Sequence, residues 1–573
     1  MSDNGAFNKK SSDKGLKIVI IGGIAAGTCA AVKARRATEE AEITLYEKYR
    51  HVSYSTCGLP YFVSGKIHDA QNLIINPAAH LEKRFNLKVK TLCEVVKIDP
   101  AAKTVTVKDL KNGGEYTDSY DKLIIATGSK PVSINPGLES APNSFCLRTV
   151  DEGVNLKEKI SALAQSAPAG TKPGAVIVGG GFIGLELLDA FIEKGFAITI
   201  IEKTNQILPP FDPEIVLYLE NYLAEKGVSV LKEREVAGFE KDSAGNINLI
   251  ITNLGEKIPA DIVFRGIGAK PDSALATRCG IQTGKTGAIV VNEHMQTNIE
   301  DIFAAGDCCE CTDFITGAKQ SYLLAGIASI QGRIAGCNAA GGTDSFSDSI
   351  PTAVIKVCDV FVAKTGASLK LARQNGINAA KIEFHGMSHG GYYPGAQMIH
   401  MMLVYNRDDG TVIGFEAIGR ESVDKKNDAV SVAIRARMKV WDLMFLNFSY
   451  HPETGSAKDS LNIIGMIGEN IRKGEQVYMD VEELRQRLAS GKKVTILDVR
   501  TRGEYASGHI DGAVNIPVDD LRENISLLDR KDEIVIHCRT SYRSYIAYRI
   551  LKNSGFENLY NLNGSYLSWM RKL

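Results

Sequence analysis

The sequence predicts a multidomain α/β protein, because two glycine-containing turns each follow an apolar strand and precede a helix, and a third βα-alternating region ends the chain. The chain has 573 residues, too many for one hydrophobic core, and a prior of about 150 residues per domain indicates roughly four domains. Lys+Arg and Asp+Glu both number 67, so net charge creates no field that attracts nucleic acid or an anionic membrane. We expect neither partner.

The N-terminal segment and the cysteines indicate the compartment. Residues 1–15 are polar and lack an apolar stretch, which predicts a disordered N-terminus. No apolar run reaches the roughly 18 residues that cross a bilayer. The cysteines number 11 and are scattered, unlike the dense, even framework of a small secreted domain. We expect a soluble cytoplasmic protein.

The clearer glycine turn lies in residues 174–184, and its three glycines are followed by an acid, Glu202, at the end of the next predicted strand. Such a turn lets the backbone approach a pyrophosphate, while the acid binds the ribose hydroxyls. We therefore predict an NAD-binding domain at 156–285, with Glu202 and its glycines as ligands: Gly179, Gly181 and Gly184. Glu202 repels a 2′-phosphate, so NADH is favoured over NADPH, although Lys203 softens that preference.

The first turn departs from the pattern, because Ile24 occupies the position of the middle glycine. An apolar strand from Lys17, a helix at Cys29–Thr38 and a strand at Ala41–Tyr46 still form a βαβ opening. Two such units imply two dinucleotides, and further strand-to-glycine segments end near residues 128 and 306. We predict an FAD-binding domain at 16–155 and 286–350, with these ligands: Gly22, Gly27, Glu47, Lys48, Thr127, Gly128, Gly306 and Asp307.

The remaining chain divides into two further domains. Residues 351–465 contain a strand at Ile399–Tyr405 and an amphipathic helix at Asp428–Leu443, which predict an α+β domain. A polar linker at 466–477 leads to a final α/β domain at 478–573.

A cysteine in a polar, glycine-rich setting follows Glu47 closely, in Ser53-Tyr-Ser-Thr-Cys57-Gly-Leu-Pro-Tyr61. This segment resembles the pyridine nucleotide-disulfide oxidoreductase family, in which a cysteine at this place stacks against the flavin. The glycine after Cys57 permits a tight entry into a helix whose dipole favours a thiolate. Related reductases carry a second cysteine five positions later, where this chain has Phe62. Cys57 is therefore expected to react with an external sulfur or to form a sulfenic acid.

The S-x-x-x-C spacing and the CGLPY segment most resemble coenzyme A disulfide reductases, and single-cysteine NADH oxidases and peroxidases are close relatives. The peroxide-handling relatives carry a histidine in the first glycine loop, where this chain has Ala25. That difference disfavours a peroxidase. The resemblance extends over residues 17–465 and implies a homodimer.

The same resemblance implies two tyrosines that approach the reactive sulfur across a dimer interface, namely Tyr450 and either Tyr392 or Tyr393. A phenol there can protonate a leaving thiolate. The usual Y-A-P-P segment is altered to Tyr450-His-Pro-Glu453, and simple packing at a dimer seam is the alternative.

The resemblance further implies contacts to coenzyme A phosphates. Lys33 and Arg36 are three residues apart on the first predicted helix and share a face. They are expected to act with Ser53, Thr56 and Lys458, the alternative being solvated surface charge.

The cysteine cluster Cys308-Cys309-x-Cys311 lacks a second ligand pair at suitable spacing and follows the Gly306-Asp307 turn directly. We therefore predict no metal site.

Residues 478–573 resemble a rhodanese domain through Val494–Arg500, Gly508-His-Ile510 and the segment Ile534-Val-Ile-His-Cys538-Arg-Thr-Ser-Tyr-Arg543. A strand delivers Cys538 to a loop that enters a helix, so backbone N–H groups converge on the sulfur and stabilise a persulfide. Arg539 and Arg543 add positive charge. The loop has the length seen in sulfurtransferases, and a merely structural domain is the alternative.

These features predict an FAD-dependent enzyme that uses NAD(P)H, with NADH favoured, to reduce persulfide, polysulfide or coenzyme A disulfide bonds through Cys57. Cys538 is expected to bind or deliver sulfane sulfur from a mobile domain on a short linker. One alternative is a coenzyme A disulfide reductase with the rhodanese domain as a docking module. The others are an NADH oxidase or peroxidase acting through a Cys57 sulfenic acid, and a non-enzymatic redox sensor or sulfur carrier.

Overall fold

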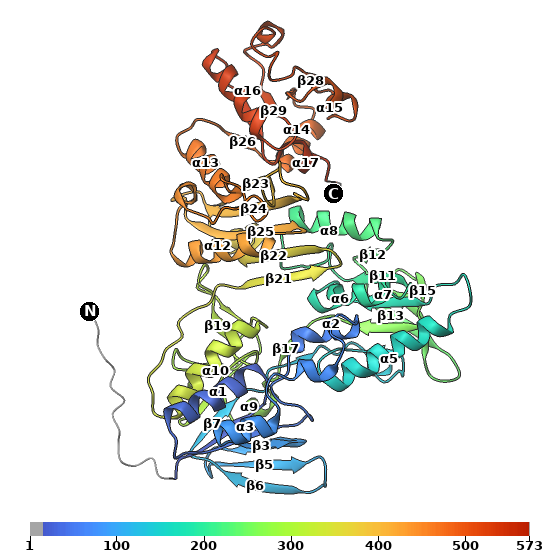
Figure 1. Cartoon of the computed structure of the whole chain (residues 1–573), viewed down its shortest axis with the longest axis vertical. Helices are drawn as coiled ribbons and strands as arrows, with labels where there is room; N and C mark the ends of the chain where they lie inside the picture. Colours follow the sequence, from blue (N-terminus) through green and yellow to red (C-terminus); the bar gives the residue numbers. More distant parts are fainter. Residues whose placement is uncertain (1–14, 572–573) are drawn as a thin grey trace. The chain divides into compact units, whose positions relative to one another are not determined.

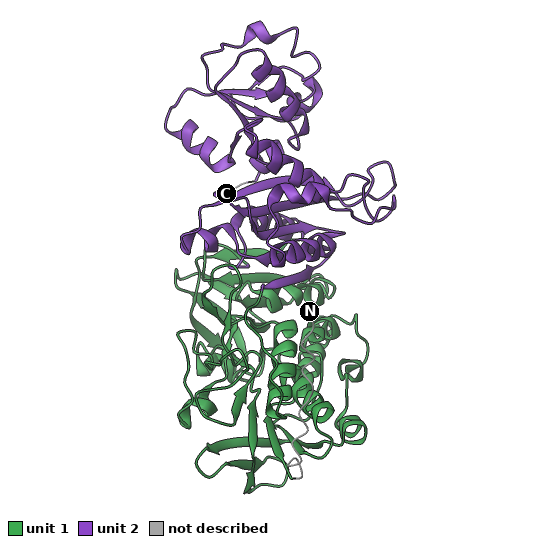
Figure 2. Ribbon diagram, turned by 90° about the vertical axis from the view of Figure 1, so that its left-hand side faces the viewer, with its two compact units in different colours: residues 1–207, 227–349 green, residues 208–226, 350–573 purple. Residues whose placement is uncertain are grey.

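A computed structural model describes residues 15–571, which form two compact units (Figures 1 and 2). Unit 1 contains residues up to 207 together with 227–349, and unit 2 contains 208–226 together with 350 onward. The segment predicted to be disordered, residues 1–15, lies outside the described residues apart from Gly15. Within the described chain, no helix combines the length and apolar character that a membrane crossing requires.

Unit 1 begins with a parallel sheet in the order β18-β7-β1-β2-β3. Both faces of such a sheet are covered, which is why strands such as β1 and β7 are largely apolar runs, whereas the edge strand β3 alternates between polar and apolar residues. The chain returns after the second glycine turn to place β18 beside β7. The strands are β1 (Lys17–Ile21), β2 (Glu42–Glu47), β3 (Lys88–Thr91), β7 (Lys122–Ile125) and β18 (Ile302–Ala304).

Two helices of unit 1 pack backbone to backbone. α1 (Ala25–Ala37) begins four residues earlier than predicted, directly after the first glycine turn, and α10 (Ala325–Ala339) lies against it. A Cβ on Gly336 of α10 would lie 2.2 Å from the carbonyl oxygen of Ala30, and one on Gly332 equally close to that of Ala26. Glycine therefore sets how closely these helices approach.

A second parallel sheet, ordered β12-β11-β10-β16-β9, carries the other glycine turn. The helical segment after this turn is divided into α6 (Phe182–Glu186) and α7 (Leu188–Ile192). The strands are β9 (Ser144–Phe145), β10 (Gly174–Val178), β11 (Ala197–Glu202), β12 (Ser229–Lys232) and β16 (Ile262–Arg265).

Smaller elements complete unit 1. They are α2 (Leu59–Val63), α3 (Ala78–Phe85), α4 (Pro136–Glu139), α5 (Val150–Ser166), α9 (Ala274–Arg278), two three-stranded antiparallel sheets of β4 (Cys93–Asp99), β5 (Thr104–Asp109), β6 (Glu115–Ser119) and of β13 (Val236–Lys241), β14 (Ile247–Thr252), β15 (Lys257–Pro259), and the strand pairs β8 (Ser129–Pro131) with β17 (Ala269–Pro271) and β19 (Cys311–Thr312) with β20 (Lys319–Gln320).

Unit 2 begins its main section with an antiparallel sheet ordered β21-β22-β25-β24-β23. The strands are β21 (Thr352–Val357), β22 (Val360–Gly366), β23 (Ala379–Met387), β24 (Met398–Asn406) and β25 (Val412–Gly419). The helix predicted at Asp428–Leu443 is wrong in extent: α12 (Val423–Arg435) ends where Arg437 adopts φ +52°, and a separate 3-10 turn, η3 (Val440–Phe445), follows.

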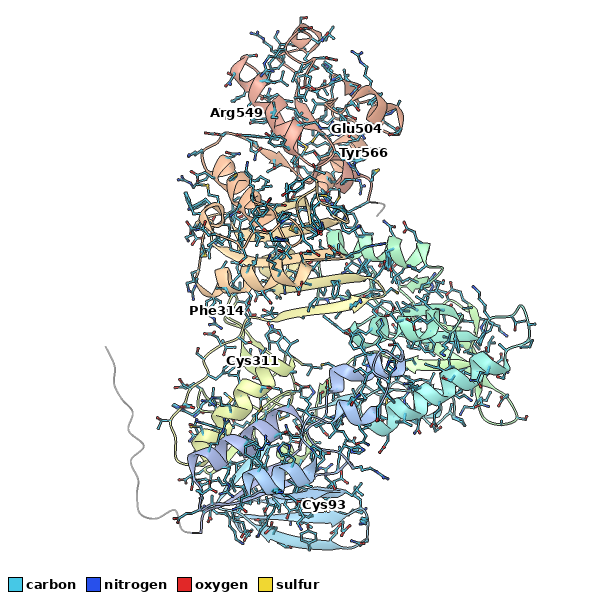
Figure 3. All side chains as sticks on the ribbon, viewed as in Figure 1. Cys93, Cys311, Phe314, Glu504, Arg549 and Tyr566 are labelled. Carbon is cyan, nitrogen blue, oxygen red and sulfur yellow. The ribbon has the colours of Figure 1, made fainter. Side chains whose placement is uncertain are left out.

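The predicted linker at 466–477 is largely helical. α13 (Ser460–Arg472) fills its first half and packs against η3. The remaining residues are also held, because Gln476 is 1% exposed and Arg549, labelled in Figure 3, donates to the Glu475 carbonyl at 2.9 Å. These contacts lie in the segment that leads into the C-terminal domain, which the sequence predicts to be mobile on a short linker.

That C-terminal domain is a parallel sheet ordered β26-β30-β29-β27-β28 within unit 2. Its elements are β26 (Tyr478–Met479), α14 (Val481–Ala489), β27 (Thr495–Asp498), α15 (Arg502–Ala506), β28 (Val514–Asn515), β29 (Ile534–His537), α16 (Tyr542–Asn553), β30 (Leu559–Leu562) and α17 (Ser565–Trp569).

One helix from the predicted NAD-binding range 156–285 belongs to unit 2. α8 (Pro213–Glu225) is preceded by Asp212, whose carboxylate accepts the backbone N–H groups of Leu369 and Lys370 at 2.5 and 3.1 Å. These two residues start α11 (Leu369–Gln374), so Asp212 caps a helix far away in sequence. Sequence order alone gave no sign of this exchange.

The close packing of α1 and α10 gives a stability prediction. Gly336→Ala is expected to destabilise unit 1 by about 1–3 kcal/mol, because its Cβ collides with backbone rather than with a side chain that can move. Gly326→Ala on the same helix meets no described atom within 4 Å, so it is expected to be neutral or to stabilise by up to about 1 kcal/mol. Thermal unfolding of both variants tests this, and equal melting temperatures would contradict it.

Candidate active site

The first glycine turn is fixed by the acid that the sequence singled out. Glu47 at the end of β2 is buried, and its carboxylate accepts the backbone N–H of Gly23 at 2.8 Å and that of Tyr49 at 2.9 Å. Burial raises the pKa of Glu47, and the two backbone hydrogen bonds oppose that shift. Gly22 has φ +104° and, like Gly27, faces backbone atoms too closely for any Cβ.

The second turn repeats this construction. Glu202 at the end of β11 accepts the Gly180 N–H at 2.8 Å and both donors of Thr204, also at 2.8 Å. Gly179 has φ +100°, and a Cβ there would lie 2.6 Å from the Gly266 carbonyl oxygen. Lys203, which the sequence offered as a modifier of nucleotide preference, is exposed and pairs with Glu235 at 3.3 Å.

The groups around the first turn fit a large phosphate-bearing dinucleotide. Among the described residues, the buried Nε of Arg148 has no hydrogen-bond partner, and the guanidinium lies 3.6 Å from the Cβ position at Gly128. Gly306 has φ +87°, and its N–H donates to the Gln331 side chain at 2.9 Å. An unsatisfied guanidinium N–H beside glycine backbone suits a phosphate or a polar ring. The sequence did not identify Arg148, which lies outside any glycine motif.

Three further predicted ligands of this domain bind protein groups. Lys48 lies 3.9 Å from the Asp272 carboxylate, and Thr127 donates its hydroxyl to the Asp272 carbonyl at 2.6 Å. Asp307 accepts the Ser129 hydroxyl at 3.2 Å, and burial raises the pKa of its carboxyl group.

Cys57 is exposed and sits in a 3-10 turn, η1 (Thr56–Gly58), that leads directly into α2. The Ser55 hydroxyl accepts the Gly58 N–H at 3.1 Å and caps this turn. α2 has only five residues, so its dipole offers little support to a thiolate.

The protein groups around Cys57 work against a thiolate. Partial burial raises the thiol pKa, Thr56 opposes this by a hydrogen bond, and the carboxylates of Glu186 and Asp307 raise the pKa further. The sequence predicts that local structure lowers the pKa of Cys57, but the surrounding side chains and burial together raise it.

Glu186 was missed by the sequence reading. It lies on α6, accepts the hydroxyl of Tyr61 on α2 at 3.2 Å, and has a pKa raised by burial to about 7. Lys66, which follows α2, pairs with Asp189 on α7. Two polar contacts therefore join the segment after Cys57 to the helices after the second glycine turn.

The residues expected to contact coenzyme A have different settings. Lys33 and Arg36 lie on α1, and the Arg36 guanidinium returns to the Val32 carbonyl at 3.2 Å. Ser53 is buried, has φ +47° and accepts the Asn76 side chain at 3.3 Å, whereas Thr56 is exposed. Lys458 is exposed on unit 2.

Of the three candidate tyrosines, Tyr392 and Tyr450 meet each other. Their hydroxyls are 2.5 Å apart, and the side chains are 73% and 49% exposed. Tyr393 lies instead edge-on to His389. An exposed phenol pair can pass a proton from one oxygen to the other, so Tyr392 rather than Tyr393 is the natural partner of Tyr450.

The cysteine cluster is buried in unit 1. The sulfurs of Cys308 and Cys309 are 3.8 Å apart, and Cys308 lies 3.5 Å from the Ile125 carbonyl oxygen. Cys311 lies on β19, 3.7 Å from the Gln320 carbonyl oxygen. These three thiols contact backbone acceptors or each other.

The Cys538 sulfur is 1% exposed and is surrounded by serines that the sequence reading missed. The backbone N–H of Ser541 donates to it at 3.1 Å, and the hydroxyls of Ser544 and Ser565 lie 3.6 and 3.9 Å away. Ser541 holds φ +87°, a conformation that is costly for a non-glycine residue and is often found at functional sites. One of the predicted backbone donors is thus present, together with two hydroxyls.

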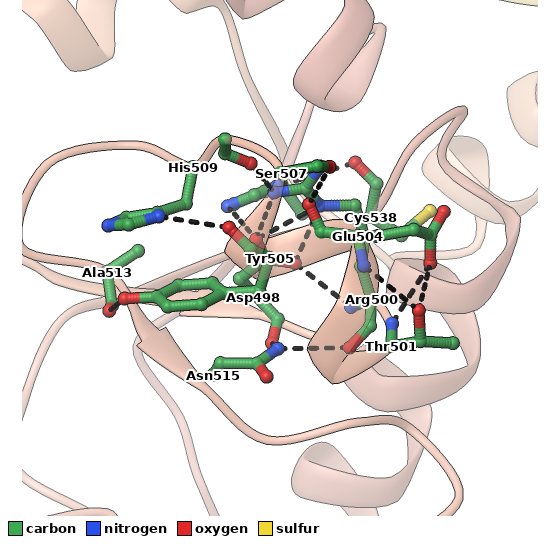
Figure 4. A network of polar contacts seen from close by, with 12 residues as sticks. Asp498, Arg500, Thr501, Glu504, Tyr505, Ser507, His509, Ala513, Asn515 and Cys538 are labelled. Atoms are coloured by element: carbon green, nitrogen blue, oxygen red, sulfur yellow. Dashed lines mark hydrogen bonds and ion pairs between the residues drawn. The ribbon is translucent and has the colours of Figure 1, made fainter.

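The two arginines predicted to add positive charge around Cys538 have different settings. Arg543 makes a bidentate pair with Glu504 at 2.7 and 2.8 Å, which holds the pKa of Glu504 at about 2, and Arg539 is exposed. Figure 4 shows Glu504 and the buried Asp498–Arg500 pair around Cys538. Glu504 lies 39 residues before Arg543, so the pairing of these two side chains depends on the fold.

Two glycine turns built for dinucleotides and a reactive thiol after the first define a flavin- and nicotinamide-dependent oxidoreductase. The chain matches three families, described as pyridine nucleotide-disulphide oxidoreductase (residues 16–332), its dimerisation domain (352–460) and the rhodanese-like domain (480–572). It belongs to the pyridine nucleotide-disulphide oxidoreductase family and carries a C-terminal rhodanese-like domain.

Solved structures and relatives extend this assignment. A reduced Bacillus anthracis protein described as CoADR-RHD is 34% identical with a TM-score of 0.91, covering 97% of this chain and 98% of that one. A NAD-dependent persulfide reductase from A. fulgidus is 34% identical with a TM-score of 0.88, covering 97% and 100%. An NADH oxidase of Methanocaldococcus jannaschii is 30% identical over 452 residues, covering 78% of this chain and 97% of that relative.

The position of Glu186 gives a prediction about Cys57. Glu186 is ionised mainly above about pH 7, and its charge then raises the Cys57 pKa. Glu186→Gln is therefore expected to speed Cys57 alkylation at pH 8 roughly threefold, because a larger fraction of the thiol is ionised. Below pH 6 the two proteins should react alike. Mass spectrometry of FAD-loaded protein after iodoacetamide treatment measures the rates.

The exposed Glu193, close behind α7, supplies the matched control. Glu193→Gln should follow the wild-type profile at every pH. Unchanged alkylation in Glu186→Gln would show that this carboxylate does not act on the thiol.

Proposed function

We propose that the protein is an FAD-dependent reductase that uses NAD(P)H, with NADH favoured, to cleave the S–S bonds of persulfides, polysulfides or coenzyme A disulfide at Cys57. The observation that carries this proposal is an exposed single thiol beside the first glycine turn, in a chain that also contains an intact Cys538 loop. The A. fulgidus persulfide reductase, which aligns over nearly the whole chain, supports the same substrate class.

FAD bound at the first turn supplies the electron pair that it receives from NAD(P)H. For a persulfide R–S–SH, the Cys57 thiolate attacks the sulfur bonded to R, the S–S bond breaks, and HS⁻ leaves, so that Cys57–S–S–R forms. Two electrons then cleave this mixed disulfide to the Cys57 thiolate and RS⁻. The sum is NADH + H⁺ + RSSH giving NAD⁺ + RSH + H₂S.

The side chains around Cys57 and the tyrosine pair have complementary roles in this proposal. The carboxylates of Glu186 and Asp307 raise the pKa of Cys57 and so disfavour an idle thiolate. Tyr392 and Tyr450, whose hydroxyls contact each other, are proposed to supply a proton to the departing RS⁻ or HS⁻. The dimerisation domain favours a homodimer, in which each subunit provides this pair.

Cys538 serves in this proposal as the sulfane-sulfur carrier. Its thiolate attacks the outer sulfur of a donor persulfide, the donor leaves as RSH, and Cys538–S–S⁻ remains against the Ser541 N–H and two serine hydroxyls. Coenzyme A is the thiol that Lys33, Arg36, Ser53, Thr56 and Lys458 are proposed to bind through its phosphates. The cysteines, all free thiols in the described chain, favour a reducing, cytoplasmic compartment.

Two alternatives share the same site. An NADH oxidase or peroxidase acting through a Cys57 sulfenic acid is favoured by the Methanocaldococcus jannaschii relative, and opposed by Ala25 in the first glycine loop. A coenzyme A disulfide reductase whose rhodanese-like domain only docks is favoured by the extensive contact of that domain with β23.

Steady-state NADH oxidation with coenzyme A persulfide, polysulfide, coenzyme A disulfide and hydrogen peroxide tests the proposal. Wild type should be fastest with the persulfide and polysulfide. Cys57→Ser should lose about a thousandfold with every sulfur substrate, as expected when a nucleophile is removed.

Cys538→Ser distinguishes the two reductase proposals. It should slow turnover of persulfide and polysulfide and leave coenzyme A disulfide reduction intact. Full retention on persulfide and polysulfide would refute the two-cysteine relay, and preference for peroxide would favour the oxidase.

A further inference from the structure

The short helix α17 contacts the Cys538 loop at its first turn. The Ser565 hydroxyl accepts the backbone N–H of Cys538 at 3.1 Å and lies 3.9 Å from its sulfur. The next two amides of α17, those of Tyr566 and Leu567, donate to the carbonyls of Cys538 and Arg539 at 3.0 and 3.3 Å. The first turn of α17 therefore holds the backbone on both sides of the thiol.

The last turn of α17 is attached to β23 of the antiparallel sheet in the same unit. The Ser568 hydroxyl donates to the Glu383 carboxylate at 2.8 Å and lies 2.9 Å from Nε2 of His385. The carbonyl of Leu567 accepts the hydroxyl of Tyr218, on α8, at 3.2 Å. Ser568 is fully buried. Its hydroxyl therefore depends on these protein partners rather than on bulk water for its hydrogen bonds.

Asn563, two residues before the start of α17, is hydrogen-bonded to the same strand. The Asn563 side chain accepts the backbone N–H of Glu383 at 2.9 Å and donates to the carbonyl of Lys381 at 3.2 Å. Because one side-chain amide both accepts from an N–H group and donates to a carbonyl group of β23, the position of Asn563 along that strand is fixed. β23 therefore forms hydrogen bonds both just before the start of α17, with Asn563, and in its last turn, with Ser568.

The charges at this contact are balanced. Glu383 is buried between Lys381 at 2.9 Å and Arg571 at 2.8 Å, and although burial acts to raise its pKa, these cations hold the pKa below its usual range. Glu383, Glu214 and Glu482 are close enough to share a metal ion. Lys381 already pairs with all three, so the cluster is an anchor rather than a vacant ligand set.

We propose that Ser568 is a positioning residue for sulfur transfer at Cys538: by anchoring α17 on β23, it holds the Ser565 hydroxyl against the thiol. The physical reason is that hydrogen bonds to sulfur depend steeply on distance and direction, and Ser565 has φ +60°, a conformation that only firm support maintains. The strand outside the rhodanese-like domain thus completes the site inside it. The inference rests on the proposed role of Cys538.

The test uses the full-length, FAD-loaded protein carrying Ser568→Ala, which removes one hydroxyl and no charge. The pH profile of Cys538 alkylation, measured by mass spectrometry, should move to higher pH, and sulfur loading of Cys538 from a persulfide donor should slow roughly threefold to tenfold. Ser568→Thr, which keeps the hydroxyl, should restore both. Coenzyme A disulfide reduction at Cys57 should stay at the wild-type rate.

Glu482→Gln is the matched control, because Glu482, on α14, lies 3.2 Å from Lys381 and 3.6 Å from Arg571 in the same charge cluster, and none of its described ion pairs is with a residue of α17. It should leave the alkylation profile unchanged. An unchanged profile in Ser568→Ala, or equal shifts in both variants, would overturn the proposal.

Tyr218→Phe provides a second route if Ser568→Ala does not fold, because it leaves Ser568 in place and removes the hydroxyl that donates to the Leu567 carbonyl and interacts with Ser568. It should shift the profile in the same direction by a smaller amount, and no shift would count against the proposal. If wild-type Cys538 takes up no sulfur, the proposed function fails, while the alkylation profiles still decide the role of Ser568.

Discussion

The hydrogen bond between a strand-end carboxylate and a glycine-turn amide is the interaction on which unit 1 depends. Glu47 with Gly23 and Glu202 with Gly180 form the same bond at 2.8 Å, one in each parallel sheet. A buried carboxylate is costly unless such donors satisfy it, so the acid keeps the turn in the single conformation that a dinucleotide requires. The first turn also fixes where the following chain goes, and Cys57 lies ten residues after Glu47.

The two reactive cysteines occupy opposite environments. Cys57 is exposed and faces carboxylates, so its own surroundings disfavour an anion. Cys538 is buried among a backbone N–H, two hydroxyls and the Arg543 guanidinium, all of which are donors suited to an anionic sulfur. This contrast matches a division in which Cys57 turns over with each electron pair and Cys538 stores a sulfur atom. Donors held in place cost no reorganisation when the anion forms.

The rhodanese-like domain is built into unit 2 through a buried polar contact with β23. Lys381, Glu383 and His385 alternate along this strand and are all buried, although alternation of polar residues ordinarily predicts a face in water. Burying them costs free energy unless every charge is paired, and the cluster satisfies that condition. Such a contact specifies one docking position more sharply than an apolar patch, because a displaced domain leaves ions unpaired. In the role proposed for Ser568, the same strand positions a hydroxyl beside a thiol in another domain.

The sequence by itself determined the features that depend on residues close together in the chain. These are the two strand-turn-helix units, the acids at their ends, the single thiol at Cys57 and the Cys538 loop, because glycine spacing, apolar runs and a strand-to-loop transition are local properties. Only the tertiary structure revealed Arg148, Glu186, the serines around Cys538, and the pairing of Tyr392 with Tyr450. It also showed that 466–472 is helical and that α8 belongs to unit 2. The reason is that each of these depends on which distant side chain arrives at a given atom. Ser565 lies 27 residues from Cys538, and Glu383 lies 185 from Ser568, and no local pattern encodes such separations.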